Sequence, residues 1–234
     1  MALFRIPKIR NLMNCLLSKP STFTNKIILL VTTLVALYAV HFILFYVQEQ
    51  WLNEFIGFKT ESNYRDRLIY SLGDHSILHL VIISTLAIPI WEELFFRSCI
   101  IFSRKNMSLF LSAVPFIILP RIINIPGYIM LISSITLGLI VYKTSFILLN
   151  KCNFSHLQNK KITMTMVILT SFAFGFGHIF NYQSINIYSI ILIIPNIIAG
   201  FAFSYVRIKN GLTWSITMHI INNLPGIITI SIET

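Results

Sequence analysis

Two adjacent glutamates interrupt a long apolar run in the segment IPIWEELFFR, residues 88–97. A charged side chain at the centre of a bilayer costs at least about 2.5 kcal/mol on insertion scales. Glu93 and Arg97 are four residues apart, so a helix places them on one face, where they can form an ion pair. Glu92 points about 100° away and has no local partner of opposite charge. It is either a structural carboxylate bonded to another helix or a general base in a cavity of low dielectric constant.

A second pattern, FGFGH, ends the apolar segment that follows the loop near residue 155. Phe174 and His178 lie one helical turn apart, so they share a face. Gly175 and Gly177 lack side chains, and we expect this part of the helix to let another helix approach closely. His178 taken alone could be an interfacial structural residue.

A third pattern, HIINN, places His219 and Asn223 one turn apart on the last apolar segment. The pair presents hydrogen-bond donors on one face, which could bind a ligand or could simply join two helices. Asn222 points elsewhere and is interpreted as structural. Other polar side chains inside apolar segments are His41, Lys143, and Asn196.

Together the three patterns supply one carboxylate, two imidazoles and an amide. This set can activate a water molecule and stabilise an oxyanion. Glu92, His178 and His219 could also form a Glu/His/His site for a divalent metal such as zinc. The spacing is not HExxH, so the helix geometry of zincin proteases does not apply.

The composition predicts an integral membrane protein. Of 234 residues, 56% are hydrophobic and only 11% are charged, against about 25% charged in soluble domains. The net charge of +10 does not indicate nucleic-acid binding, because the basic residues lie at the ends of apolar segments. The cysteines at 15, 99 and 152 show no CxxC spacing, so no disulfide framework is predicted.

Long apolar segments must position these residues, and apolar and polar residues do not alternate strictly within them. This pattern predicts an all-α transmembrane bundle of six to eight spans. The third segment is shorter than a full span and is either re-entrant or continues past Pro120 and Arg121 as a broken helix. The segments cover residues 27–47, 77–102, 108–119, 128–150, 162–181, 186–206, and 212–232.

Charge asymmetry predicts the topology. Residues 1–26 form a basic segment that we expect in the cytoplasm, followed by one membrane domain over residues 27–234. The polar stretch 48–74 falls on the outer side and is predicted to lie along the interface. In this scheme His178 lies near the outer end of its span, whereas Glu92 and His219 lie nearer the inner end. The basic residues predicted to share the inner side are Arg104, Lys105, Lys151, Lys160, Lys161, Arg207, and Lys209.

The three patterns resemble the motifs of the CPBP family, the CAAX-protease and bacteriocin-processing (Abi) type of intramembrane protease. Glu92-Glu93-x-x-x-Arg97 matches EExxxR, Phe174-x-x-x-His178 matches FxxxH, and His219-x-x-x-Asn223 matches HxxxN. The resemblance covers residues 77–232, the expected protease core. Two features depart from the family: Ser98 stands where many members have glycine, and an additional helical pair over 108–150 separates the first two motifs.

The resemblance implies peptide-bond hydrolysis in a peptide or membrane-associated protein. Glu92 and His178 would activate the water, and His219 and Asn223 would stabilise the oxyanion. Glu93, Arg97, and Phe174 would be structural. This scheme requires no cofactor, although the family was first described as metalloproteases and a zinc ion remains an alternative.

Other function classes predict different behaviour. A bacteriocin immunity protein or a membrane scaffold of the same family would act without proteolysis. A transporter could use the buried acids as a proton relay. The expected partners of the leading hypothesis are the bilayer and a peptide or membrane-protein substrate, with no nucleic acid, in the cytoplasmic membrane of a bacterium.

Overall fold

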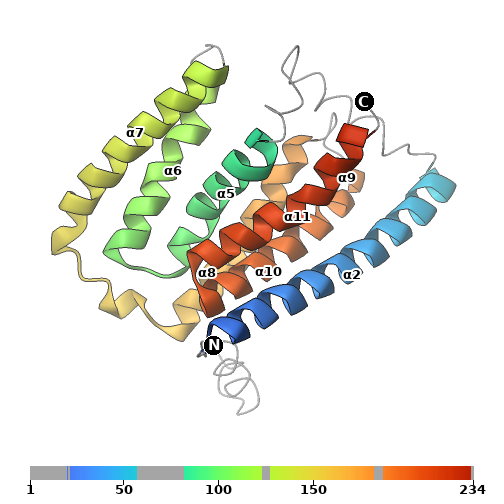
Figure 1. Cartoon of the computed structure of the whole chain (residues 1–234), viewed down its shortest axis with the longest axis horizontal. Coiled ribbons are helices and arrows are strands. Elements are labelled where there is room, and N and C mark those ends of the chain that lie inside the picture. Colours follow the sequence, from blue (N-terminus) through green and yellow to red (C-terminus); the bar gives the residue numbers. More distant parts are fainter. Residues whose placement is uncertain (1–19, 21, 57–81, 123–126, 182–186, 233–234) are drawn as a thin grey trace.

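The computed structural model describes residues 20, 22–56, 82–122, 127–181 and 187–232. Every regular element within these ranges is helical, which confirms the predicted all-α bundle (Figure 1). The α-helices are α2 (Phe23–Ile56), α5 (Ile88–Phe96), α6 (Arg104–Ile122), α7 (Gly127–Leu148), α8 (Lys160–Gly177), α9 (Ile187–Leu192), α10 (Ile194–Asn210), and α11 (Leu212–Ile232).

Short turns of other helix types join these helices. A π-helical turn, η2 (Ile83–Ala87), precedes α5, and a 3-10 turn, η3 (Ser98–Ile100), follows it. Three more 3-10 turns are η4 (Leu149–Lys151), η5 (Ser155–Leu157), and η6 (His178–Asn181).

Four helices in the described part of the chain are long and apolar enough to cross a membrane. They cover Phe23–Gln48, Ile129–Lys151, Lys160–Phe180 and Ser189–Asn210. Their outward-facing side chains are largely apolar, as expected for a surface in contact with lipid. The chain is therefore an integral membrane protein, and the count of six to eight spans stays a prediction.

Two of the apolar segments change helix type or divide next to a proline. The described part of the run 77–102 is not one regular α-helix: the π-helical turn η2 leads into α5, which begins at Ile88, carries Pro89 in its first turn and ends at Phe96. The run 186–206 divides at Ile193, where α9 ends and α10 begins with a proline in its first turn. Proline lacks a backbone N–H and is therefore accommodated where a helix starts.

The third segment is an unbroken helix, α6, which extends past Pro120 and Arg121. It packs along α7 as a hairpin beside α5 (Figure 1). A Cβ atom on Gly138 of α7 would lie 2.8 Å from the Ser112 carbonyl oxygen of α6, so the two backbones approach closely. Trp91 of α5 donates from Nε1 to the Ala113 carbonyl at 2.8 Å and ties the hairpin to the helix that carries Glu92.

Helices α8 and α10 pack closely along a stretch of small residues. A Cβ atom on Gly200 would lie 2.9 Å from the Ser171 Cα, and one on Gly175 would lie 2.9 Å from the Ile197 backbone nitrogen. The expected close approach at Gly175 is thus confirmed. At Gly177 it is wrong for the part of the chain that the structure describes, where nothing lies within 4 Å of a Cβ built there.

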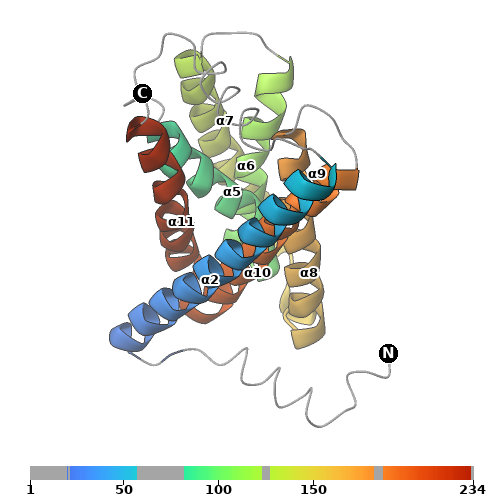
Figure 2. The same ribbon diagram turned by 90° about the vertical axis from the view of Figure 1, so that its right-hand side faces the viewer.

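Helix α2 crosses the outside of the bundle over α10 and contacts α11 (Figure 2). Its buried Leu30 and Leu37 join the core formed by Phe174, Phe203 and Met218. Residues 48–56 continue α2 rather than start a separate interfacial helix. The remainder of the predicted interfacial stretch, like most of the basic segment 1–26, lies outside the described residues.

The helix ends that carry the basic clusters gather at one end of the bundle. The beginnings of α2, α6 and α8 and the ends of α7 and α10 lie together at the bottom of Figure 1. This agrees with the expectation that these clusters share one side of the membrane.

The α8–α10 contact gives a first prediction. Gly175→Ala forces a methyl group against the Ile197 backbone, and overpacking of this kind costs about 1–3 kcal/mol. We expect the unfolding temperature of the purified protein in detergent to fall by about 3–10 °C. Gly177→Ala is the matched control and should leave the unfolding temperature unchanged. Equal changes in unfolding temperature for both variants would contradict the close contact between Gly175 and Ile197.

Candidate active site

Glu93 and Arg97 form the predicted ion pair at the end of α5. Arg97 Nε lies 3.6 Å from Glu93 Oε1, and neither side chain is exposed to solvent. The Arg97 backbone N–H also donates to the Glu93 carbonyl and closes the last turn of the helix. The spacing of four residues therefore produces the contact that it predicted.

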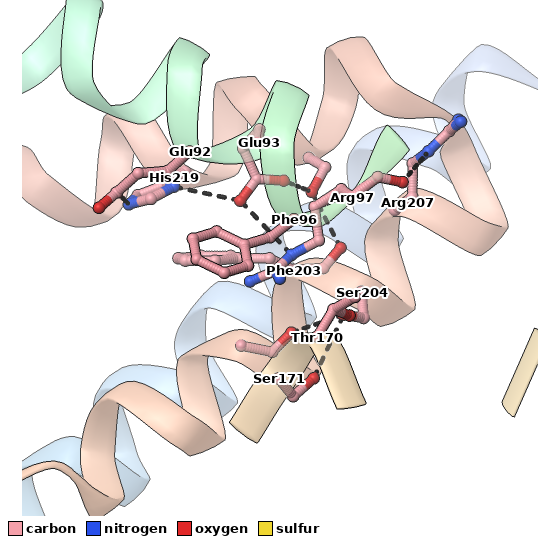
Figure 3. A network of polar contacts seen from close by, with 12 residues as sticks. Glu92, Glu93, Phe96, Arg97, Thr170, Ser171, Phe203, Ser204, Arg207 and His219 are labelled. Atoms are coloured by element: carbon pink, nitrogen blue, oxygen red, sulfur yellow. Dashed lines mark hydrogen bonds and ion pairs between the residues drawn. The ribbon is translucent and has the colours of Figure 1, made fainter. Parts of the chain in front are cut away.

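Arg97 is not the only partner of Glu93 (Figure 3). Ser215 of α11 donates its hydroxyl hydrogen to Glu93 Oε2. His219 Nδ1 lies 3.1 Å from Glu93 Oε1. The prediction that Glu93 is neutralised by Arg97 was therefore incomplete, because this carboxylate also joins α5 to α11.

The guanidinium of Arg97 sits among aromatic rings. Its Cζ lies 4.9 Å from the Phe174 ring centroid, 5.8 Å from that of Phe96 and 5.9 Å from that of Phe203. Ring faces attract a cation, and they do so more strongly where water is absent. Phe174 therefore covers the cation that pairs with Glu93.

The backbone at Arg97 has its own support. Arg207 at the end of α10 donates from Nε to the Arg97 carbonyl at 3.2 Å, and its side chain is buried. The sequence suggested only that Arg207 marks the inner side of the membrane. It also anchors the point where α5 ends.

His219 lies between the two glutamates (Figure 3). Its Nδ1 faces Glu93, as described above, and its Nε2 lies 3.5 Å from Glu92 Oε2. The imidazole stacks on Phe203 with ring centroids 4.4 Å apart and planes 21° apart. Glu92 therefore has a partner of opposite charge when His219 is protonated, although that partner comes from another helix.

His178 caps α8. Its Nδ1 lies 2.9 Å from the Phe174 carbonyl oxygen. Because a carbonyl oxygen only accepts, Nδ1 must carry the hydrogen, and in a neutral imidazole Nε2 is then a hydrogen-bond acceptor. This hydrogen bond also satisfies one of the last carbonyls of α8.

The Phe174 ring contacts the rings of both histidines. The Phe174 ring lies 4.7 Å from the His178 ring and 5.6 Å from the His219 ring, measured between centroids. Glu92 is 18% exposed and His178 is partly buried, whereas Glu93 is fully buried.

Asn223 points at a carbonyl that has lost its usual donor. The π-helical bonding before α5 runs from the N–H of one residue to the carbonyl five residues earlier, as from Ile88 to Ile83. The next donor in this series would be Pro89, which has no N–H for the Ser84 carbonyl. Asn223 Nδ2 lies 3.4 Å from this oxygen. A carboxamide has two N–H groups, so one can hold this contact while the other binds a ligand.

Sequence reasoning missed Ser215, Arg207, Phe96, and Phe203 as members of the site. Ser215 could have been found, because Ser215, His219 and Asn223 follow one another at intervals of four residues. The aromatic pair and Arg207 gave no such signal, since apolar aromatics are common in these helices and basic residues are common at helix ends.

Three other polar candidates lie elsewhere. His41 of α2 bonds the Pro195 carbonyl from Nε2 at 3.0 Å. Lys143 is exposed on α7. Asn196 is half-buried near the start of α10.

The geometry does not favour a metal centre. Both imidazole nitrogens of His219 face carboxylate oxygens, and Nδ1 of His178 is bound to a carbonyl. Within the part of the chain that the structure describes, no group of three or more His, Cys, Asp or Glu side chains could hold a metal ion. Glu92, His178 and His219 therefore do not fit a common divalent ion in this arrangement.

Comparison with protein families identifies the family of the chain. Residues 74–225 match the family model described as type II CAAX prenyl endopeptidase Rce1-like. The chain belongs to this family. The match includes α5, α8 and α10 and the first two thirds of α11, and thus every residue of the site, whereas α2 lies outside it. No curated protein and no solved structure matches the chain. Family membership identifies it as a membrane protease that acts on a peptide or protein substrate.

The partners of Glu93 give a second prediction. Ser215→Ala removes a hydrogen bond to a buried carboxylate, a loss worth about 1.5–3 kcal/mol. We expect the unfolding temperature to fall by about 3–10 °C. Thr217→Ala, on the exposed face of the same helix, removes only a bond to the Thr213 carbonyl and serves as the control. If Ser215→Ala left the unfolding temperature unchanged, Glu93 would not depend on this hydroxyl.

Proposed function

We propose that the protein is an intramembrane endopeptidase in which a glutamate and a histidine activate water. The observation that carries the proposal is the pair of carboxylates on His219: Glu93 is fully buried and holds the ring, while Glu92 faces the accessible side. Adjacent glutamates thus have separate environments, one suited to structure and one to chemistry. The proposed catalytic residues are Glu92, His178, His219, and Asn223.

In the proposed first step a water molecule binds between Glu92 and Nε2 of His178. Glu92 takes one proton as the water oxygen bonds to the carbonyl carbon of the scissile peptide. The carbonyl π electrons move to its oxygen, which becomes an oxyanion. Glu92 then returns the proton to the leaving amine as the C–N bond breaks, which yields a carboxyl and an amino terminus.

The oxyanion requires hydrogen-bond donors that are fixed before the reaction. The second N–H of Asn223 is available beyond its contact with Ser84. An imidazole of His219 protonated on both nitrogens would donate from Nδ1 to Glu93 and from Nε2 toward the reacting group. Glu93 would then orient His219, and Arg97 would compensate the charge of Glu93.

The proposed substrate is a peptide or a membrane-associated protein cut near the membrane face. The family description names CAAX prenyl endopeptidases, so a prenylated peptide belongs in a substrate panel. For a bacterial protein, a peptide pheromone or a bacteriocin leader is the favoured class. We place the protein in the cytoplasmic membrane with its N-terminus in the cytoplasm.

The third prediction concerns the proposed base. Glu92→Gln keeps the size of the side chain and removes its ability to accept a proton. We expect cleavage of a fluorogenic substrate in proteoliposomes to fall by about 10²–10⁴-fold, the usual contribution of general base catalysis. His178→Ala should cause a comparable loss, whereas His156→Ala, on an exposed turn, should retain the wild-type rate.

Retained cleavage by both Glu92→Gln and His178→Ala would overturn the mechanism. A biological phenotype that survives the double variant, without any cleavage, would instead favour a non-proteolytic immunity or scaffold role.

The fourth prediction concerns cofactors. We propose a reaction without a bound metal, because Glu92, His178 and His219 form no group that could hold a metal ion within the part of the chain that the structure describes. Cleavage should therefore persist within about twofold after dialysis against a zinc chelator, a difference within the usual assay scatter. A reaction that depended on a metal would instead be slowed by about 10–100-fold or more. Loss of activity that added zinc restores would contradict this proposal.

A further inference from the structure

Pro225 lies inside α11 and supplies no N–H to the Ile221 carbonyl four residues earlier. In lipid, a backbone carbonyl that loses its donor needs another partner from the protein. Ile221 lies between His219 and Asn223, so the local path of α11 at this residue sets where both side chains point.

Tyr38 of α2 supplies a donor to this carbonyl. Its hydroxyl oxygen lies 3.1 Å from the Ile221 oxygen, and the tyrosine is partly buried. The two residues are 183 positions apart in the sequence. Because α2 lies outside the family match, this contact is not part of the three motifs.

The same arrangement occurs a second time along α2. Pro195 supplies no N–H to the Ile191 carbonyl, and Gln48 donates from Nε2 to that oxygen at 3.0 Å. His41 donates from Nε2 to the carbonyl of Pro195 itself at 3.0 Å. Two prolines in two other helices thus each have a donor from α2 on the carbonyl four residues before them.

We propose that Tyr38 is a positioning residue for the peptidase site, acting through the Ile221 carbonyl. The inference rests on the proposed function, since it assigns Tyr38 a role in holding His219 and Asn223. The Tyr38 hydroxyl, from α2, fixes the backbone of α11 near Pro225. Glu93, from α5, holds the His219 side chain. Among the described residues, Asn223 has only a long side-chain hydrogen bond, to the Ser84 carbonyl at 3.4 Å, and depends on the helix backbone for its place.

Catalysis is sensitive to such placement, because an error of about 1 Å in a donor can cost about 10²-fold in rate. Removal of the Tyr38 hydroxyl frees a carbonyl in the turn that joins the two donors. The helix can then bend differently at Pro225. The rate of the chemical step should fall more than the affinity for substrate, because the proposed donors act on the oxyanion that forms during the reaction.

The test is a double-mutant cycle between Tyr38→Phe and Pro225→Ala. Tyr38→Phe removes one hydroxyl, and we expect kcat to fall about tenfold while KM stays within twofold. Pro225→Ala restores a backbone N–H four residues after Ile221, so Tyr38→Phe in that background should change kcat by less than about twofold. Tyr46→Phe, an exposed tyrosine on the same helix, is the matched control and should match the wild type.

The unfolding temperature supplies a readout that does not need activity. Tyr38→Phe should lower it by about 2 °C in the wild-type background and leave it unshifted in the Pro225→Ala background. If the wild type cleaves no substrate, the proposed function fails. The double-mutant cycle measured by the unfolding temperature still shows whether Tyr38 acts through Ile221. The inference would be overturned if Tyr38→Phe had the same kcat and unfolding temperature as Tyr46→Phe. It would also be overturned if Tyr38→Phe lowered kcat by the same factor in the wild-type and Pro225→Ala backgrounds.

Discussion

The structure depends on a single carboxylate that has no access to solvent. Glu93 would be very costly to bury alone, because a charge without partners in a medium of low dielectric constant loses its hydration. It is stabilised by Arg97 one turn along its own helix and by Ser215 and His219 from α11. These contacts fix the last turn of α5 against α11, and with it the position of Glu92.

The aromatic residues around this network serve the same constraint. Phe96, Phe174 and Phe203 surround the Arg97 guanidinium and exclude lipid and water from it. Phe203 also stacks on His219, and Phe174 reaches both histidines. One buried cluster therefore orders residues of α5, α8, α10 and α11, which explains how three short motifs on separate helices come to share one site.

Prolines supply a second kind of contact between helices. Each of Pro89, Pro195 and Pro225 leaves a carbonyl without its regular donor, and a side chain from another helix approaches each of these oxygens. Water could satisfy such a group in a soluble protein, but the interior of a bilayer offers none. A residue that usually weakens a helix thus becomes a point where two helices must meet.

The sequence by itself determined the features that arise from local spacing and composition. Long apolar segments required helices, and a separation of four residues required the contact between Glu93 and Arg97. The tertiary structure alone decided that Glu93 also holds His219, 126 residues away, and that Gly175 but not Gly177 lies against another helix. Periodicity within one helix says which residues share a face, but it does not say which helix that face meets. That choice follows from packing and from the need to pair every buried charge and carbonyl, which involves the whole chain at once.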